Sequence, residues 1–149
     1  MRRRDFITLL GCAAAAWPLA ARAQQPDRMR RMGMLMNRAA DSQDGQAHVA
    51  AFQQALQQLG WSEGRNVQID VRWGGTDADR QRRYAQELVT LAPDIILATG
   101  TAGMRPLLQA TRTVHIVFAI VADPVGAGCV DSLARPGGNA TGLPRSNTA

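Results

Sequence analysis

The sequence predicts an α/β fold, a Rossmann-like, doubly wound parallel sheet with the strand order 2-1-3-4-5. Two apolar runs, residues 95–98 and 116–121, flank a segment of helical character, residues 102–111. Neither run alternates polar with apolar residues, which is typical of parallel strands that are covered on both faces. Each run ends in small or polar residues, and ligands of open parallel sheets bind at the carboxyl ends of the strands.

The first strand and the first helix of this fold lie near the start of the chain. Residues 32–36 form a short apolar run, which predicts a strand, and a polar loop follows it. Further on, apolar residues recur at helical spacing, namely Val49, Phe52, Leu56 and Leu59. This spacing predicts an amphipathic helix from about residue 46. Gly60 is its expected stop.

The second strand is predicted at or near the sheet edge. Residues 67–71 alternate apolar with polar side chains, as a half-buried strand does. Asp77 is a suitable N-cap for the next helix, because its carboxylate can accept from free backbone N–H groups. The apolar spacing of this helix continues to Leu91. Its arginines, Arg80, Arg82 and Arg83, indicate a solvated face more readily than a phosphate-binding patch.

The remaining strands follow at regular intervals. Residues 95–98, 115–121 and 140–143 are the third, fourth and fifth strands, with the 102–111 helix between the first two of them. Pro106 is expected in the first turn of that helix, where its missing N–H costs little. A short helix is predicted over residues 126–134. Alternation of strands and helices in this order defines the doubly wound topology.

The charge of the chain gives little support for nucleic-acid binding. The 149 residues carry a net charge of +5, and all 17 basic residues are arginine. Four of these lie in the first 22 residues. Without residues 1–23, 13 arginines face 11 acidic residues, so the remainder is nearly neutral.

Metal and cofactor binding are not expected. The chain has two cysteines, Cys12 and Cys129, and two histidines, His48 and His115, too few for a zinc site once Cys12 falls in a targeting segment. His115 enters a strand and is expected to be a core or edge histidine. No residue pattern indicates catalysis, so we expect a protein that is not an enzyme.

Residues 1–23 have the composition of an export signal. Arg3, Arg4 and Phe6 open an apolar, alanine-rich run in the manner of a twin-arginine signal, although a Sec signal has similar features. Ala21 and Ala23 form a small-x-small cleavage site. The run is too short for a stable membrane anchor. We therefore expect a periplasmic protein in which residues 24–30 are a flexible arm.

Several motifs resemble the ABC transporter substrate-binding protein family of the tryptophan/tyrosine-uptake type. They are Asp-Pro-Val-Gly-Ala-Gly at 123–128, Arg-Pro-Gly-Gly-Asn-x-Thr-Gly at 135–142 and Leu-Gly-Trp-x-Glu-Gly-Arg-Asn at 59–66. The resemblance implies a type I periplasmic binding protein, in which a small, amino acid-like solute is captured between two lobes and passed to a transporter permease. Aromatic amino acids are among the candidate solutes. Residues 31–143 then form the N-terminal lobe.

The resemblance ends abruptly after Gly142. Members of the family continue with a segment such as Phe-Thr-Ser-Phe-Glu-Tyr-Ser, and one codon spelling of it, read one base out of register, encodes Pro-Arg-Ser-Asn-Thr-Ala. This is the sequence of residues 144–149. We therefore expect an aberrant, out-of-frame tail and a truncated product that is impaired in binding. Resequencing the locus tests this expectation.

The expected ligand-binding residues lie where strands end. Asn37 follows the first strand, and the segment Thr99, Gly100 and Thr101 precedes a helix, where N–H and hydroxyl groups suit a carboxylate. Asp123 follows the fourth strand and suits an amine. Alternatively, the two threonines only cap the helix and Asp123 only caps the turn at Gly126.

Other classes of protein fit the sequence less well. The first strand is not followed by Gly-x-Gly-x-x-Gly, as a dinucleotide-dependent enzyme requires, and no Gly-x-Ser-x-Gly elbow indicates a hydrolase. Phospho-receiver domains typically keep a lysine, which this chain lacks. Sugar-binding regulators carry a DNA-binding helix pair in place of the export signal. The remaining alternatives are a non-functional relict fragment or another periplasmic Rossmann-like binding module.

Overall fold

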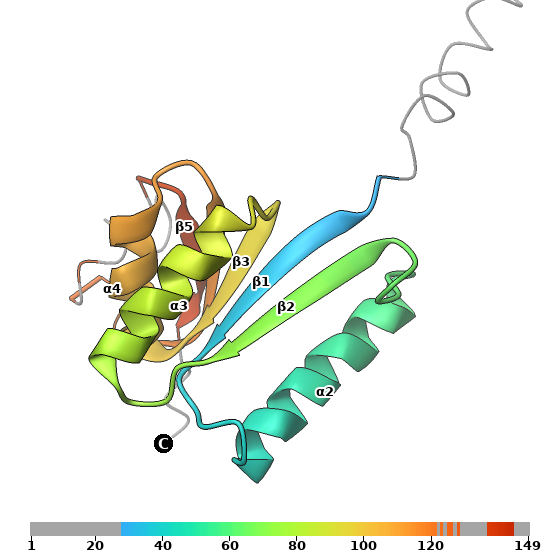
Figure 1. The fold of residues 1–149 in the computed structure, drawn as a ribbon, viewed down its shortest axis with the longest axis horizontal. Coiled ribbons are helices and arrows are strands. Elements are labelled where there is room, and N and C mark those ends of the chain that lie inside the picture. The colour runs from blue at the N-terminus through green and yellow to red at the C-terminus, as the bar shows by residue number, and fades with distance from the viewer. Residues whose placement is uncertain (1–27, 122, 124, 127, 129–136, 145–149) are drawn as a thin grey trace, which may run out of the picture.

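The computed structural model of the chain describes residues 28–121, 123, 125–126, 128 and 137–144. In this part of the chain, five parallel strands form one sheet in the order β2-β1-β3-β4-β5, which confirms the predicted topology (Figure 1). The strands are β1 (Arg30–Met36), β2 (Val67–Trp73), β3 (Ile95–Thr99), β4 (His115–Val121) and β5 (Ala140–Pro144). The helices are α2 (Gln43–Gln58), α3 (Ala78–Thr90) and α4 (Gly100–Ala110).

Helix α2 begins three residues before its predicted start. The Oγ of Ser42, its N-cap, accepts a hydrogen bond from the Gly45 N–H at 3.2 Å, and this capping contact is what begins the helix. The predicted stop is confirmed, because Gly60 follows the end of the helix with a φ of 90° that favours glycine.

Helix α3 is capped by the residue that the sequence predicts. Asp77 Oδ1 accepts from the backbone N–H groups of Arg80 and Asp79, each at 3.0 Å. These hydrogen bonds, together with the nearby arginines, lower the pKa of Asp77. The ionised carboxylate of Asp77 is therefore the form that these hydrogen bonds to the N-terminus of α3 favour.

Helix α4 differs from its prediction at the start. It begins at Gly100, directly after β3 and without a loop. Pro106 is therefore the seventh residue of the helix, inside it rather than in its first turn. The predicted position was wrong because we expected residues 99–101 to form a loop. Their backbone instead enters the helix at the strand end.

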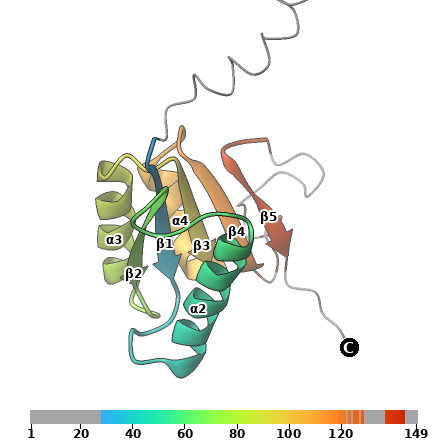
Figure 2. The same cartoon turned by 90° about the vertical axis from the view of Figure 1, so that its right-hand side faces the viewer.

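Helices α3 and α4 together cover one face of the sheet (Figure 2). On this face β3 and β4 contribute Ile96, Ala98, Ile116 and Phe118, which are almost completely buried. These side chains belong to one core cluster with residues of α3 and α4, including Leu88. Gly33 of β1 allows the close approach, because a Cβ there would lie 3.2 Å from Leu88 Cδ2.

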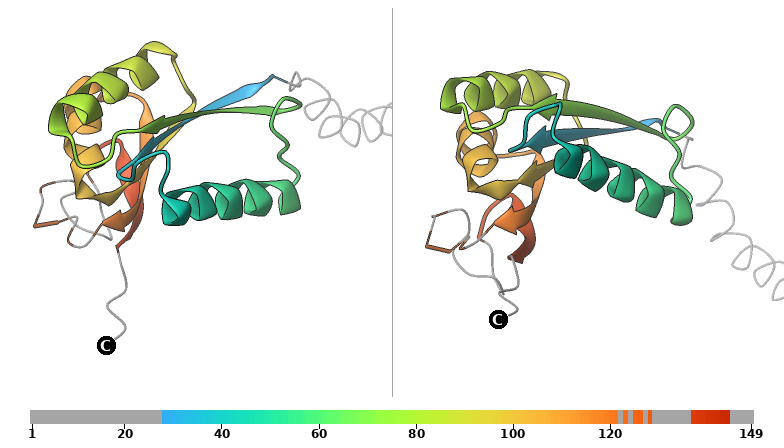
Figure 3. Two further views of the ribbon diagram at one scale, coloured as in Figure 1. Left: turned by 60° about the horizontal axis from the view of Figure 1, so that its bottom comes forward. Right: turned by 90° about the horizontal axis from the view of Figure 1, so that it is seen from below.

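Helix α2 lies on the opposite face of the sheet (Figure 3). Its Val49 is buried with Met34 and Met36 of β1 and with Val67 and Ile69 of β2. No other helix of the described residues covers this face. The prediction that β3 and β4 are covered on both faces is therefore wrong for this part of the chain.

Several predictions concern residues outside the described part. These are the export signal with Arg3, Arg4, Phe6, Ala21 and Ala23, most of the helix at 126–134, and most of the tail. The described strands extend one residue beyond the predicted lobe at each end, since β1 begins at Arg30 and β5 ends at Pro144. Among the described helices, none has the length and apolarity required to span a bilayer.

Candidate functional site

The carboxyl ends of β1, β3 and β4 lie next to one another in the sheet. Asn37 directly follows β1, Thr99 ends β3, and Asp123 lies two residues after β4. Because parallel strands end at the same edge, the topology brings the predicted binding residues to one edge of the sheet. Whether they form one site depends on their individual contacts.

Asn37 and Thr99 form a hydrogen-bonded pair across β1 and β3. The Asn37 N–H donates to Thr99 Oγ1 at 3.1 Å, and the Thr99 hydroxyl is 3.1 Å from Asn37 Oδ1. Asn37 Oδ1 is the nearer acceptor for the Thr99 hydroxyl, since the Leu35 carbonyl oxygen lies at 3.5 Å. This pairing leaves the Asn37 Nδ2 group as a donor. Thr99 is only 5% exposed, so the hydroxyl is protected from water.

Gly100 is required beside this pair for two reasons. Its φ of 72° lies in the left-handed region, which favours glycine. A Cβ at this position would also overlap with Asn37 Nδ2. The glycine thus places the Asn37 amide against the start of α4.

The N-terminus of α4 has no side-chain cap. Thr99 occupies the N-cap position but makes no capping hydrogen bond, because its hydroxyl contacts Asn37 instead. The alternative that Thr99 only caps the helix is therefore wrong. Thr101 is exposed in the first turn. An uncapped helix N-terminus carries partial positive charge and can donate N–H groups to an anion.

Asp123 caps the turn at Gly126, as the alternative interpretation of the sequence expected. Its Oδ1 accepts from the Gly126 N–H at 2.8 Å, so the side chain caps the turn after β4. The residue is exposed. No hydrogen bond joins it to Asn37 or Thr99 among the described contacts. The structure thus brings together Asn37, Thr99 and Gly100, with Asp123 at the same edge but engaged locally.

Gln81 supports the site and was missed from the sequence. This fully buried residue donates from Nε2 to the carbonyl of Met36, at 3.2 Å, and to that of Gly75, at 2.8 Å. It therefore ties the end of β1, just before Asn37, to the loop after β2. The signal in the sequence was a polar residue in line with Ala85 and Leu88 on the apolar face of α3.

Ile120 was also missed, and it lies at the same edge. The pairing of β4 with β5 shifts register between Phe118 and Val121. Inside this irregularity Ile120 has a φ of 60° and is 39% exposed, whereas Val121 is fully buried. Left-handed backbone is unfavourable for a β-branched residue. Hydrophobic patterning does not reveal such a bulge, because the apolar run continues through it.

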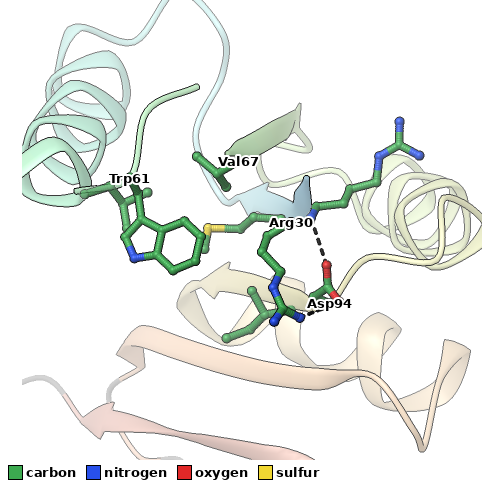
Figure 4. A pocket seen from close by; sticks show the side chains of 8 residues that line it. Arg30, Trp61, Val67 and Asp94 are labelled. Carbon is green, nitrogen blue, oxygen red and sulfur yellow. Dashed lines mark hydrogen bonds and ion pairs between the residues drawn. The ribbon is translucent and has the colours of Figure 1, made fainter. Parts of the chain in front are cut away.

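A cavity lies at the other end of the sheet (Figure 4). It has a volume of about 370 Å³ and an apolar wall that includes Trp61 and Val67. Asp94 lies at its rim, where Oδ2 accepts from the Arg31 N–H at 2.9 Å and Oδ1 is 3.6 Å from Arg30 Nη1. The backbone hydrogen bond and the arginines lower the pKa of Asp94. The predicted site residues lie at the opposite, carboxyl ends of the strands.

The described residues offer no metal-binding chemistry in either place. Nowhere in this part of the chain do three His, Cys, Asp or Glu side chains come together. The carboxyl edge instead presents neutral hydrogen-bonding groups beside a helix N-terminus. A doubly wound lobe with such an edge belongs to a class of fold that binds small ligands at the carboxyl ends of its strands.

Comparison with known proteins places the chain within this class. The family model described as ABC transporter substrate binding protein matches residues 40–149. The chain therefore belongs to the ABC transporter substrate-binding protein family, whose members are transport components that capture solutes. This confirms the resemblance found in the sequence.

The chain is also similar to individual members of known function or structure. It is 35% identical over 91 residues to a tyrosine-binding protein of Clostridioides difficile, a match that covers 61% of this chain and 26% of that protein. A conserved domain protein of Vibrio cholerae is 29% identical with a TM-score of 0.72, over 78% of this chain and 39% of that one. An ABC domain from Streptococcus pneumoniae in complex with L-Trp is 27% identical with a TM-score of 0.70, over 78% and 38%. The chain thus spans less than half the length of these relatives.

Proposed function

We propose that this chain is the first lobe of an extracytoplasmic solute-binding protein of an ABC importer, and that its solute is an amino acid with an aromatic side chain. The observation that carries the proposal is the Asn37–Thr99 pair beside the uncapped N-terminus of α4. The tyrosine and L-Trp named for two relatives support the choice of solute.

The solute carboxylate would bind between α4 and Asn37. Free N–H groups in the first turn of the helix and the Nδ2 group of Asn37 are all donors, which suits an anion. Gly100 leaves the space in which the Asn37 amide lies. Thr99 acts as a positioning residue, because its hydroxyl orients the Asn37 amide.

The other parts of the solute have candidate contacts at the same edge. Ile120 presents exposed apolar surface for a side chain. Asp123 Oδ2, the oxygen that does not cap the turn, would accept from the solute amine. The exported location and the permease partner belong to the same proposal, and they are supported by the family and by the signal-like sequence of residues 1–23.

One lobe supplies only part of the contacts of a solute held between two lobes. The 149 residues span 39% of the length of a solved relative, so taken alone they can account for only part of such a set of contacts. Lost contacts reduce affinity without a compensating gain. We therefore expect weak binding by this chain alone.

A ligand titration tests the proposal. L-tyrosine and L-tryptophan should raise the melting temperature of the purified chain and of the control Thr90→Val, whose hydroxyl bonds only within α3. Thr99→Val keeps the size and shape of the side chain but frees the Asn37 amide. It should weaken binding by about fivefold to tenfold, the value of one hydrogen bond.

Two results would contradict this function. An equal ligand shift in Thr99→Val and in wild type would place binding elsewhere. A cooperative melt that neither amino acid moves, at concentrations that saturate the full-length relatives, would favour the relict fragment.

A further inference from the structure

A fully buried amide lies behind the carboxyl edge of the sheet, on the apolar face of α3. It belongs to Gln81, and the next residues on this face of the helix, Ala85 and Leu88, are buried and apolar. Gln81 Nε2 donates to the carbonyls of Met36 and Gly75, whereas Oε1 has no hydrogen-bond partner among the described residues. A buried polar atom without a partner is costly. Packing alone therefore does not explain a glutamine here, and the two donated hydrogen bonds are what an apolar residue could not supply.

The hydrogen bond to Met36 acts on the peptide unit that joins Met36 to Asn37. Its carbonyl accepts from Gln81 Nε2 at 3.2 Å and from the Gly74 N–H at 3.0 Å. Its N–H group, which belongs to Asn37, donates to Thr99 Oγ1 at 3.1 Å. Because a peptide unit is planar and rigid, its carbonyl and its N–H turn together. Gln81 and Thr99 therefore hold one peptide unit from its two sides, and that unit ends at the Cα that carries the Asn37 side chain.

Two glycines allow the Gln81 amide to reach this position. A Cβ on Gly74, in the loop after β2, would overlap with Gln81 Cδ. A Cβ on Gly103, in α4, would lie 3.6 Å from Gln81 Oε1, so no side chain separates the amide oxygen from that helix. The Gln81 amide thus lies where the end of β1, the loop after β2 and α4 meet.

We propose that Gln81 is a positioning residue of the solute site, which holds the Asn37 amide at the start of α4 in the orientation that receives the solute carboxylate. The proposal rests on the proposed function and adds the group that orients the binding residue from inside the lobe. The Asn37 amide lies against Gly100, where a Cβ would overlap with Asn37 Nδ2. Rotation of the Met36–Asn37 peptide would therefore move this donor relative to the N–H groups of the helix. Gln81 itself does not touch the solute, because it is fully buried.

Binding of L-tyrosine and of L-tyrosinamide to the full chain tests this role. The two probes share the ring and the amine, but L-tyrosinamide lacks the negative charge that the donors of Asn37 and α4 suit. Gln81→Met keeps the length of the side chain and removes both donated hydrogen bonds. It should weaken the binding of L-tyrosine about fivefold or more, and that of L-tyrosinamide less than about twofold. The preference of the chain for the carboxylate should thus fall.

Ala85→Gly is the matched control. Ala85 lies one turn after Gln81 on the same buried face of α3, and glycine there destabilises the helix without removing a polar contact. This variant should lower the melting temperature and leave the ratio of the two affinities as in wild type. If Gln81→Met does not fold, Gln81→Asn, whose amide is one methylene too short to reach both carbonyls, takes its place. A variant of Gln81 that melts earlier but keeps the wild-type ratio would overturn the proposal, because the residue would then be structural only.

NMR spectra of the chain without solute separate this proposal from the proposed function. In Gln81→Met, the side-chain NH2 signals of Asn37 and the N–H signal of Gly100 should shift, whereas in Ala85→Gly they should remain at their wild-type positions. Unshifted signals in Gln81→Met would overturn the positioning role even where L-tyrosine binds. Shifted signals in a chain that binds neither L-tyrosine nor L-tryptophan would confirm that Gln81 orients Asn37 and would contradict the proposed function instead.

Discussion

The two faces of the sheet are built from the same strands but are packed very differently. The face under α3 and α4 buries eleven residues in one cluster, whereas the face under α2 buries five. Neighbours on one strand show the contrast, since Ile96 is fully buried and Leu97 is only half-buried. Burial is thus decided by which helices cover a face. Among the described residues, the face under α3 and α4 therefore holds most of the buried core.

The largest expected effect comes from comparing these two neighbours on β3. Ile96→Ala removes a buried side chain and leaves a cavity, which should lower the free energy of unfolding by about 3 to 4 kcal/mol. Leu97→Ala removes a side chain of the same size from the face under α2. It should cost about 1 kcal/mol, because that side chain is still partly in water. Urea denaturation of both variants measures the difference. Equal losses would show that the α2 face is covered as well as the other.

A smaller effect is expected at the amino end of β3, where Asp94 contacts the backbone and arginines of the β1 segment. Asp94 accepts from the Arg31 N–H and pairs with arginines, and these contacts lower its pKa in the folded state. Asp94→Asn should reduce stability by about 1 kcal/mol at neutral pH.

The sign of its pH dependence follows from the lowered pKa. The stabilisation by Asp94 is fully present above the unfolded pKa of about 3.9 and is lost as the pH falls through the lower folded pKa. The difference between wild type and Asp94→Asn should therefore shrink when urea melts are repeated in acid. Asp41→Asn, at an exposed position, is the control. A difference that does not change with pH would assign the effect to side-chain geometry alone.

The smallest effect, and one of opposite sign, is expected where β4 leaves the sheet. Ile120→Gly should stabilise the fold by about 0.5 to 1 kcal/mol, because glycine adopts the left-handed backbone at this position without strain. Ile120→Val keeps a β-branched residue and should not stabilise. Thermal melts compare the two variants. A lower melting temperature for Ile120→Gly would mean that its side chain contributes more by packing than its backbone costs.

Much of the fold was predictable because it depends on local patterns. The strand order follows from the alternation of apolar strands with helices. The N-cap at Asp77 and the stop at Gly60 depend on single residues with strong local preferences. The early start of α2 at Ser42 and the position of Pro106 were missed, because both depend on how the chain leaves a strand.

The candidate site was predictable in its location and less so in its contacts. The sequence places Asn37 and Thr99 at the ends of predicted strands, and therefore at one edge of the sheet. Their mutual hydrogen bonds were not predictable, because the two residues are 62 positions apart. Gln81 was missed for the same reason, since its acceptors lie on two other segments. Such contacts are set only when distant segments meet.

By itself, the sequence determined the class of fold, the family and the edge of the sheet that holds the candidate site, because each follows from short-range patterns and motifs. The tertiary structure decided which hydrogen-bond partners the groups at that edge have. It showed that the Thr99 hydroxyl contacts Asn37, that Asp123 caps a turn, and that no described helix other than α2 covers the second face of the sheet. The physical reason is that burial and hydrogen-bond partners depend on neighbours far away in the sequence, and only the folded chain brings those neighbours together.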